Sequence, residues 1–126
     1  MSKILGLGND IICVARIKES IDKFGSNFLD KLFTEKEQQY CSLHRNSATR
    51  FAGRFAVKEA IAKAFGTGFG KEFGWHDVEV LNDPETGKPY PLFSEKAKKL
   101  MGNASIHITI SHCEEYASAV AIWQSH

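Results

Sequence analysis

Residues 50–70, RFAGRFAVKEAIAKAFGTGFG, have the strongest helical character in the chain and end in a cluster of glycines. At about 100° per residue, most of the circumference of such a helix is apolar. The apolar positions are Phe51, Ala52, Val57, Ala60, Ile61, Ala64 and Phe65. A helix with so wide an apolar surface is usually buried. We therefore expect a central helix on which the rest of the chain packs.

Two lines of charge interrupt that apolar surface. Glu59 and Lys63 lie one turn apart on one side, and Arg50, Arg54 and Lys58 form a second polar line on another. A buried carboxylate normally has a charge partner, a metal or hydrogen bonds, so Glu59 is a candidate functional acid. The alternative is a Glu–Lys pair at i,i+4 that only supports the helix.

Composition favours one folded domain over residues 1–126, with 25% charged residues and a formal net charge of +1. This balance argues against disorder and against a broad nucleic-acid surface, so any basic site must be local. No apolar run approaches the ~20 residues of a membrane span, and we expect no signal peptide. Cys13, Cys41 and Cys113 show no CxxC spacing. They indicate free thiols in a reducing compartment, and hence a cytoplasmic protein.

The N-terminal residues 3–14 are mostly apolar and predict a buried strand. Gly6 and Gly8 within it mark a bend or a place where another backbone or a ligand comes close. Asp10 is an uncommon residue for such a strand. Either it caps a turn or the following helix at the end of the strand, or it is a functional acid.

The remaining pattern predicts an α+β fold, a small antiparallel sheet packed on the long central helix and shorter helices. We expect helices over residues 15–24, 35–44 and 94–101, and an apolar segment at 28–32 after a stop at 25–27. Thr34 and Glu37 form a capping box, Ser47 or Thr49 caps the central helix, and Gly66 ends it. Strands at 77–81 and 89–92 flank a turn, and those at 105–111 and 116–123 form a hairpin.

Asp10 and Glu59 are the acids in the least expected places. Two carboxylates converging from different elements suit Mg²⁺, which completes its shell with water and substrate phosphates. Lys63, with Arg54 and Lys58 nearby, would supply positive charge for those phosphates. Zinc binding and thiol catalysis are disfavoured, because adjacent residues such as His112 and Cys113 point to opposite faces of a strand.

Several motifs together resemble the holo-[acyl-carrier-protein] synthases, a branch of the 4′-phosphopantetheinyl transferases. They are Gly6-Leu7-Gly8-Asn9-Asp10-Ile11 with Arg16-Ile17, Arg50 to Ala60 (RFAGRFAVKEA), Lys63 to Gly68 (KAFGTG), Gly87-Lys88-Pro89, and Ile110-Ser111-His112 with Tyr116-Ala117. The resemblance covers nearly the whole chain in the right order.

The resemblance implies transfer of 4′-phosphopantetheine from coenzyme A to a serine of apo-acyl carrier protein, in support of fatty acid biosynthesis. Adenosine 3′,5′-bisphosphate would be the other product. By the same resemblance, Asp10 and Glu59 hold Mg²⁺, Lys63 contacts phosphate, and Ser111 and His112 lie beside the coenzyme A. The family forms homotrimers with active sites between subunits.

The resemblance also bears on the glycine loop and on the carrier. Gly66 and Gly68 would belong to the coenzyme A site. Because acyl carrier proteins are acidic, Arg16, Arg50 and Arg54 are candidates to dock them. For Arg50 and Arg54 the alternative is a solvated helix edge.

Some alternatives stay open at the level of sequence. The base that takes the serine proton is either Glu59 or a water on the metal. The sequence departs from the usual family pattern at Cys13, where an acid is common nearby, and at Asn9. Rival functions are a broad-specificity phosphopantetheinyl transferase, a non-catalytic coenzyme A or nucleotide-binding protein and, least favoured, a nucleic-acid-binding domain.

Overall fold

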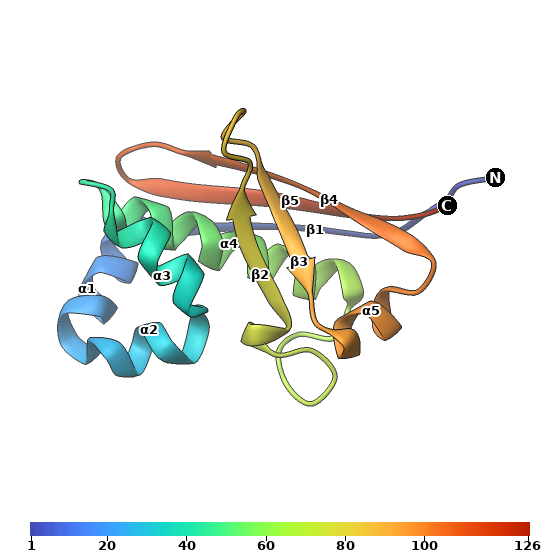
Figure 1. Ribbon diagram of the computed structural model, residues 1–126, viewed down its shortest axis with the longest axis horizontal. Coiled ribbons are helices and arrows are strands. Elements are labelled where there is room, and N and C mark those ends of the chain that lie inside the picture. The colour runs from blue at the N-terminus through green and yellow to red at the C-terminus, as the bar shows by residue number, and fades with distance from the viewer.

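The computed structural model describes residues 1–126 and has the α+β architecture expected from the sequence (Figure 1). Its elements are β1 (Ile4–Cys13), α1 (Val14–Phe24), α2 (Ser26–Leu32), α3 (Glu35–Ser42), α4 (Ser47–Phe65), the 3₁₀ turn η1 (Trp75–Asp77), β2 (Val78–Asn82), β3 (Pro89–Phe93), α5 (Glu95–Met101), β4 (Ala104–His112) and β5 (Tyr116–Ser125). No helix is both long and apolar enough to cross a membrane.

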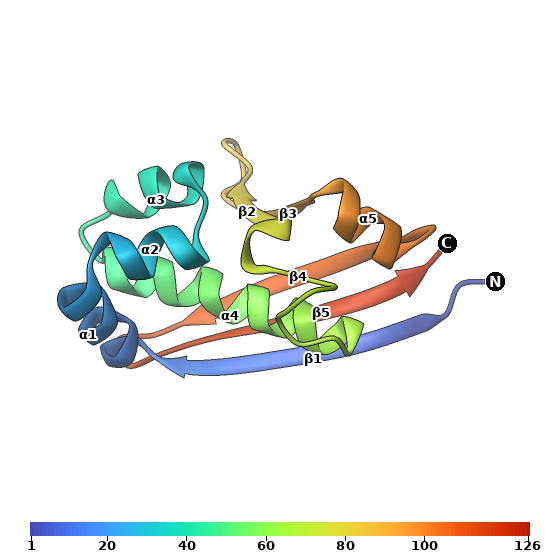
Figure 2. The same ribbon diagram turned by 90° about the horizontal axis from the view of Figure 1, so that it is seen from below.

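The three long strands form one antiparallel sheet in the order β1-β5-β4, and β2 and β3 form a separate hairpin. The central helix α4 lies along one face of the sheet, and Figure 2 shows the other helices on that same side. The opposite face of the sheet is therefore left without a covering helix.

Small residues let α4 approach the sheet closely. Ala119 and Ala121 of β5 are buried against it, together with Ala60 of α4. A Cβ atom added to Gly8 would overlap the carbonyl oxygen of Ala60, and one added to Gly6 would overlap that of Ala64. The expectation that these strand glycines mark a close backbone approach is confirmed.

Replacing Gly8 with alanine is expected to lower the free energy of unfolding by about 2–3 kcal/mol, because the new methyl group forces β1 away from α4. Urea unfolding followed by circular dichroism measures the effect. Gly70→Ala is the matched control, because a Cβ there meets open space and φ is not positive. A Gly8→Ala midpoint equal to that of the control would contradict the close packing.

The local end signals of the helices are partly as predicted. The Thr34 side chain accepts from the Glu37 N–H and the Glu37 carboxylate accepts from the Thr34 N–H, so the capping box is confirmed. Gly66 ends α4 in the left-handed conformation, at φ 77°. The predicted cap by Ser47 or Thr49 is wrong. Asn46 precedes the helix and makes no side-chain cap, so the first turn already includes Ser47.

The apolar segment at residues 28–32 is a helix, which the sequence did not reveal. Gly25 takes a positive φ of 55° and turns the chain in one residue, so α2 begins at Ser26 directly after α1. The intrinsic helix propensity of this segment is weak. The helical conformation buries Leu32 in the core, and this tertiary packing favours the helix.

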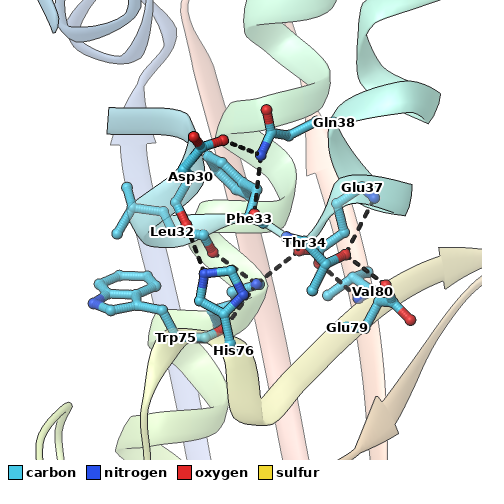
Figure 3. Close-up of polar contacts among 11 residues, drawn as sticks. Asp30, Leu32, Phe33, Thr34, Glu37, Gln38, Trp75, His76, Glu79 and Val80 are labelled. Carbon is cyan, nitrogen blue, oxygen red and sulfur yellow. Dashed lines mark hydrogen bonds and ion pairs between the residues drawn. The ribbon is translucent and has the colours of Figure 1, made fainter. Parts of the chain in front are cut away.

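The second polar line of α4 is buried rather than solvated. Lys58 was expected near the phosphates, but it is 0% exposed and its Nζ lies 2.8 Å from Glu37 Oε1. The same Nζ donates to the Leu32 and Trp75 carbonyls at 2.8 Å. The other Glu37 oxygen accepts from the Val80 N–H at 2.7 Å (Figure 3). This network ties α2, α3, η1 and β2 to α4, so Lys58 has a structural role.

Candidate active site

Asp10 and Glu59 come together where β1 crosses α4. The close approach at Gly8 places the next inward-facing residue of β1, Asp10, against the helix side that carries Glu59 and Lys63. Lys63 Nζ lies 3.3 Å from Asp10 Oδ1 and donates to the Asn9 carbonyl at 3.0 Å. Lys63 makes no ion pair with Glu59, so the alternative of a simple helix-supporting pair is wrong. The lysine bridges two elements instead.

The two acids line one pocket of about 430 Å³. Arg16 of α1 lies at this pocket, and Phe55 and Tyr116 contribute apolar wall. Ile11, Ile12 and Cys13 complete the lining. The pocket thus combines carboxylates, a nearby cation and an apolar surface, which suits a charged ligand with an uncharged arm.

The carboxyl of Glu59 has a raised pKa. Burial is the main cause and the neighbouring Asp10 charge adds to it, while the Lys63 ammonium opposes them. A cation bound beside Glu59 would stabilise its charged form. No group of three or more His, Cys, Asp or Glu side chains is placed to hold a metal ion. Because Mg²⁺ typically uses only one or two protein carboxylates, the Asp10–Glu59 donor set fits it.

A second, basic pocket of about 150 Å³ lies at the other edge of the fold. Its polar groups are Arg50 and Arg54 of α4, His112 at the end of β4, and Asn82 at the end of β2. Thr49, Gly53, Gly87, Pro89 and Ile110 complete the lining. We call this the arginine pocket. It has three basic side chains and no acidic one, so it favours an anion.

The candidate residues therefore fall into two groups within one chain. β1, which carries Asp10, and β4, which carries Ser111 and His112, lie on opposite sides of β5 in the sheet. His112 lines the arginine pocket, and Ser111, being the adjacent strand residue, points to the other face. One copy of the chain does not bring Ser111 or His112 to the two acids.

The predicted carrier-docking arginines also separate. Arg16 is exposed at the rim of the acidic pocket. Arg54 is only 3% exposed and contacts Tyr40 and Asn82, so it does not form the solvated edge that was considered. Arg50 is half-buried and lines the same pocket. The reason is that the Arg50–Lys58 side of α4 faces α3 and the β2–β3 hairpin rather than solvent.

The glycine loop follows the C-terminal end of α4. Gly66 and Gly68 are exposed and have φ of 77° and 63°.

Sequence reasoning missed Asn82, Phe55 and the arginine pocket. One signal in the sequence could have indicated this pocket. Arg50, Arg54 and Lys58 lie at i, i+4 and i+8 on an otherwise apolar helix, and buried cations need polar or charged partners.

The comparisons with known proteins match nearly the whole chain. The family model described as the 4′-phosphopantetheinyl transferase superfamily matches residues 6–121. The chain is 49% identical to the holo-[acyl-carrier-protein] synthase of Protochlamydia amoebophila over 121 residues, covering 96% of this chain and 98% of that one.

Two solved structures extend the match to the fold. The holo-(acyl-carrier-protein) synthase of Bacillus anthracis in complex with CoA (3′,5′-ADP) superposes with a TM-score of 0.84 at 38% identity, covering 98% of both chains. That of Helicobacter pylori in complex with coenzyme A gives 0.83 at 31% identity, covering 93% of this chain and 98% of that one.

Proposed function

The chain belongs to the 4′-phosphopantetheinyl transferase superfamily, among the holo-[acyl-carrier-protein] synthases, and we propose that it transfers 4′-phosphopantetheine from coenzyme A to a serine of apo-acyl carrier protein. The products are holo-acyl carrier protein and adenosine 3′,5′-bisphosphate. The reaction supports fatty acid biosynthesis. The observation that carries the proposal is that Asp10 and Glu59 line one pocket, with the Lys63 ammonium 3.3 Å from Asp10. Phosphoryl transfer depends on such charged groups to position the phosphates and to stabilise their charge.

Asp10 and Glu59 would hold Mg²⁺ through their carboxylates. When bound, the ion lowers repulsion among the pyrophosphate oxygens and stabilises the leaving group. The raised pKa of Glu59 supports this assignment, because a buried acid beside another acid gains from a cation. By holding the ion, the two carboxylates would fix the position of the pyrophosphate relative to the attacking serine, and such positioning is the main source of rate in this chemistry.

The chain's own groups then act on the two reactants. The serine hydroxyl of the carrier attacks the β-phosphorus of coenzyme A in line, and the bond to the leaving phosphate breaks. Lys63 is half-exposed on a long side chain, so we assign its Nζ to a phosphate oxygen. We assign the serine proton to a Glu59 carboxylate oxygen, because Glu59 lines the pocket and, unlike Asp10, makes no ion pair with Lys63.

We propose that the arginine pocket takes a phosphate group of coenzyme A, with His112 beside it. Ser111, Gly66 and Gly68 stay predicted neighbours of the coenzyme. The arginine pocket and the acidic pocket lie at opposite edges of the sheet in one chain. A single coenzyme A molecule would therefore bind between two copies of the chain, in the arginine pocket of one copy and the acidic pocket of the other.

A homotrimer with active sites between subunits meets that need, and the sheet offers a surface for it. On the face without helices, Leu5, Leu7 and Ile11 of β1 are 46%, 65% and 65% exposed. An apolar strand surface of this kind marks an interaction site. We propose that it packs against other copies of this chain.

Replacing Leu7 with lysine is expected to dissociate the trimer, because it places a charge at the centre of this face, opposite Ile122. Light scattering after size-exclusion chromatography measures the mass, and transfer should fall with it. The exposed Leu43→Lys is the matched control and should stay trimeric, since Leu43 lies in the α3–α4 connection. A monomeric wild type that is fully active would contradict the proposal.

The carrier is proposed to dock on α1. Arg16 lines the acidic pocket and also a neighbouring surface pocket, in which Arg16 and Lys23 outnumber the one acid, Glu19. Phe24 lines the same surface pocket, and its ring centre lies 5.3 Å from the Lys23 ammonium. This basic surface with an exposed aromatic ring suits an acidic carrier and delivers its serine beside the acids.

The three cysteines are unpaired, which suits the cytoplasm as the place of the reaction.

The test of function is the mass of the carrier. Incubation with apo-acyl carrier protein, coenzyme A and Mg²⁺ should add one phosphopantetheine group to the carrier, and Asp10→Ala should not. Coenzyme A binding without transfer by the wild type would favour the non-catalytic binding protein. Equal turnover on a peptide-synthetase carrier would favour the broad-specificity transferase.

A further inference from the structure

The buried cations of α4 are unequally compensated. Arg50, Arg54 and Lys58 follow one another at helical spacing, and Glu37 is the acid that pairs with Lys58. Neither arginine has an Asp or Glu oxygen within 4.0 Å, although Arg54 is only 3% exposed. Burying a cation without an anionic partner is costly. The structure therefore holds a charge that an external anion would satisfy.

Two neutral groups hold the Arg54 guanidinium in place. Its carbon lies 4.3 Å from the centre of the Tyr40 ring, a cation–π contact from α3. One of its terminal nitrogens donates to Asn82 Oδ1, at the end of β2. The Nε atoms of Arg54 and Arg50 are buried and have no hydrogen-bond partner. Arg54 is thus oriented but not neutralised.

Asn82 also fixes the rim of the arginine pocket. Its Nδ2 donates to the Gly87 carbonyl at 2.9 Å, within the β2–β3 turn, and Gly87 lines the pocket with Arg54. The amide uses its acceptor for Arg54 and its donor for the turn. An aspartate here would also accept from Arg54, but it would cancel the charge and lose the donor. The neutral side chain is what leaves the pocket cationic.

We propose that Tyr40 and Asn82 are positioning residues for anion binding: they orient buried Arg54 without neutralising it, so that a phosphate of the nucleotide is its counter-ion. This rests on the proposed function for the nucleotide, namely coenzyme A or the adenosine 3′,5′-bisphosphate product. It adds two residues, from α3 and β2, that need not touch the ligand.

The decisive comparison is Asn82→Asp with Asn82→Ala. Both lose the hydrogen bond to Gly87, and only the aspartate gives Arg54 an internal counter-ion. We expect Asn82→Asp to be the more stable of the two and yet to bind adenosine 3′,5′-bisphosphate at least tenfold more weakly than Asn82→Ala. A structural role alone predicts the opposite order, with binding following stability. Calorimetry on the intact oligomer gives affinity, and thermal unfolding gives stability.

Tyr40 supplies the second comparison. Tyr40→Phe keeps the ring over Arg54 and should bind the bisphosphate within twofold of the wild type, since no hydrogen bond of the hydroxyl is present. Tyr40→Leu keeps apolar bulk but removes the π face, and should bind about fivefold more weakly. Asn27→Asp, an exposed site on α2, controls for the added negative charge and should bind as the wild type does.

The outcomes separate this proposal from the function on which it rests. Bisphosphate binding that is the same in Asn82→Asp and the wild type, or absent from the wild type, overturns the roles of Asn82 and Tyr40 even when phosphopantetheine transfer is intact. Loss of affinity in the expected order supports them even if the wild type fails to modify the carrier, which would overturn the proposed function alone.

Discussion

Glu59→Gln is expected to lower the rate of phosphopantetheine transfer by a factor of about 10²–10³ while raising the melting temperature of the metal-free protein. The rate falls because glutamine is a weaker metal ligand than a carboxylate and cannot take the serine proton. The melting temperature rises because the substitution removes a partly buried charge beside Asp10. Loss of activity with a gain in stability is typical of a residue kept for function.

The pH dependence follows from the raised pKa of Glu59, caused first by burial and then by Asp10. Since the folded state holds this proton more tightly than the unfolded chain, the free energy of unfolding falls as pH rises from the ordinary glutamate range through the folded-state pKa. Glu59→Gln should lack this component. Melting temperatures measured across that range in EDTA, for the variant and the wild type, give the comparison.

Mg²⁺ supplies a further readout of Glu59. The ion should raise the melting temperature of the wild type by binding the folded state and should do so much less in Glu59→Gln. Glu79→Gln is a control, because Glu79 lies on β2 and accepts from Thr34 Oγ1 away from the acidic pocket. Equal stabilisation of all three proteins by Mg²⁺, or unchanged transfer by Glu59→Gln, would contradict the role of Glu59.

Much of the fold is encoded in local patterns, and these could be predicted. Gly8, the Thr34–Glu37 capping box and Gly66 each act through neighbours in sequence or through one close contact. Helix α2 escaped prediction because Ser26 and Asn27 are common in loops. What makes this segment helical is the positive φ of Gly25 and packing against the core, which are properties of the tertiary structure.

The candidate site divides in the same way. Asp10 and Glu59 stood out because acids in apolar elements need a reason, and the structure does bring them to one pocket. The partners of the α4 cations come from distant segments, Glu37 for Lys58 and Asn82 for Arg54. No spacing in the sequence shows such pairing, so the sequence alone leaves a solvated helix edge open for Arg50 and Arg54.

Lys58→Met is expected to lower the free energy of unfolding by about 3–5 kcal/mol, because it leaves the Glu37 carboxylate buried without its cation. The Leu32 and Trp75 carbonyls would also lose a donor. Burial lowers the pKa of Lys58, and the Glu37 charge opposes that shift. Hydrogen bonds and the ion pair therefore keep Lys58 and Glu37 charged in the core. Removing either side chain leaves the other as an unpaired buried charge, which lowers the free energy of unfolding.

A double-mutant cycle tests whether that cost belongs to the pair. Adding Glu37→Gln to Lys58→Met removes the orphaned charge but keeps an acceptor for the Val80 N–H, so the double variant should lose less than the sum of the single changes. The exposed pair Lys18 and Asp22, 2.9 Å apart on α1, is the matched control, and Lys18→Met should cost less than about 0.5 kcal/mol. Additive losses at Lys58 and Glu37, measured by urea unfolding, would show that packing rather than charge pairing fixes α4 beneath the site.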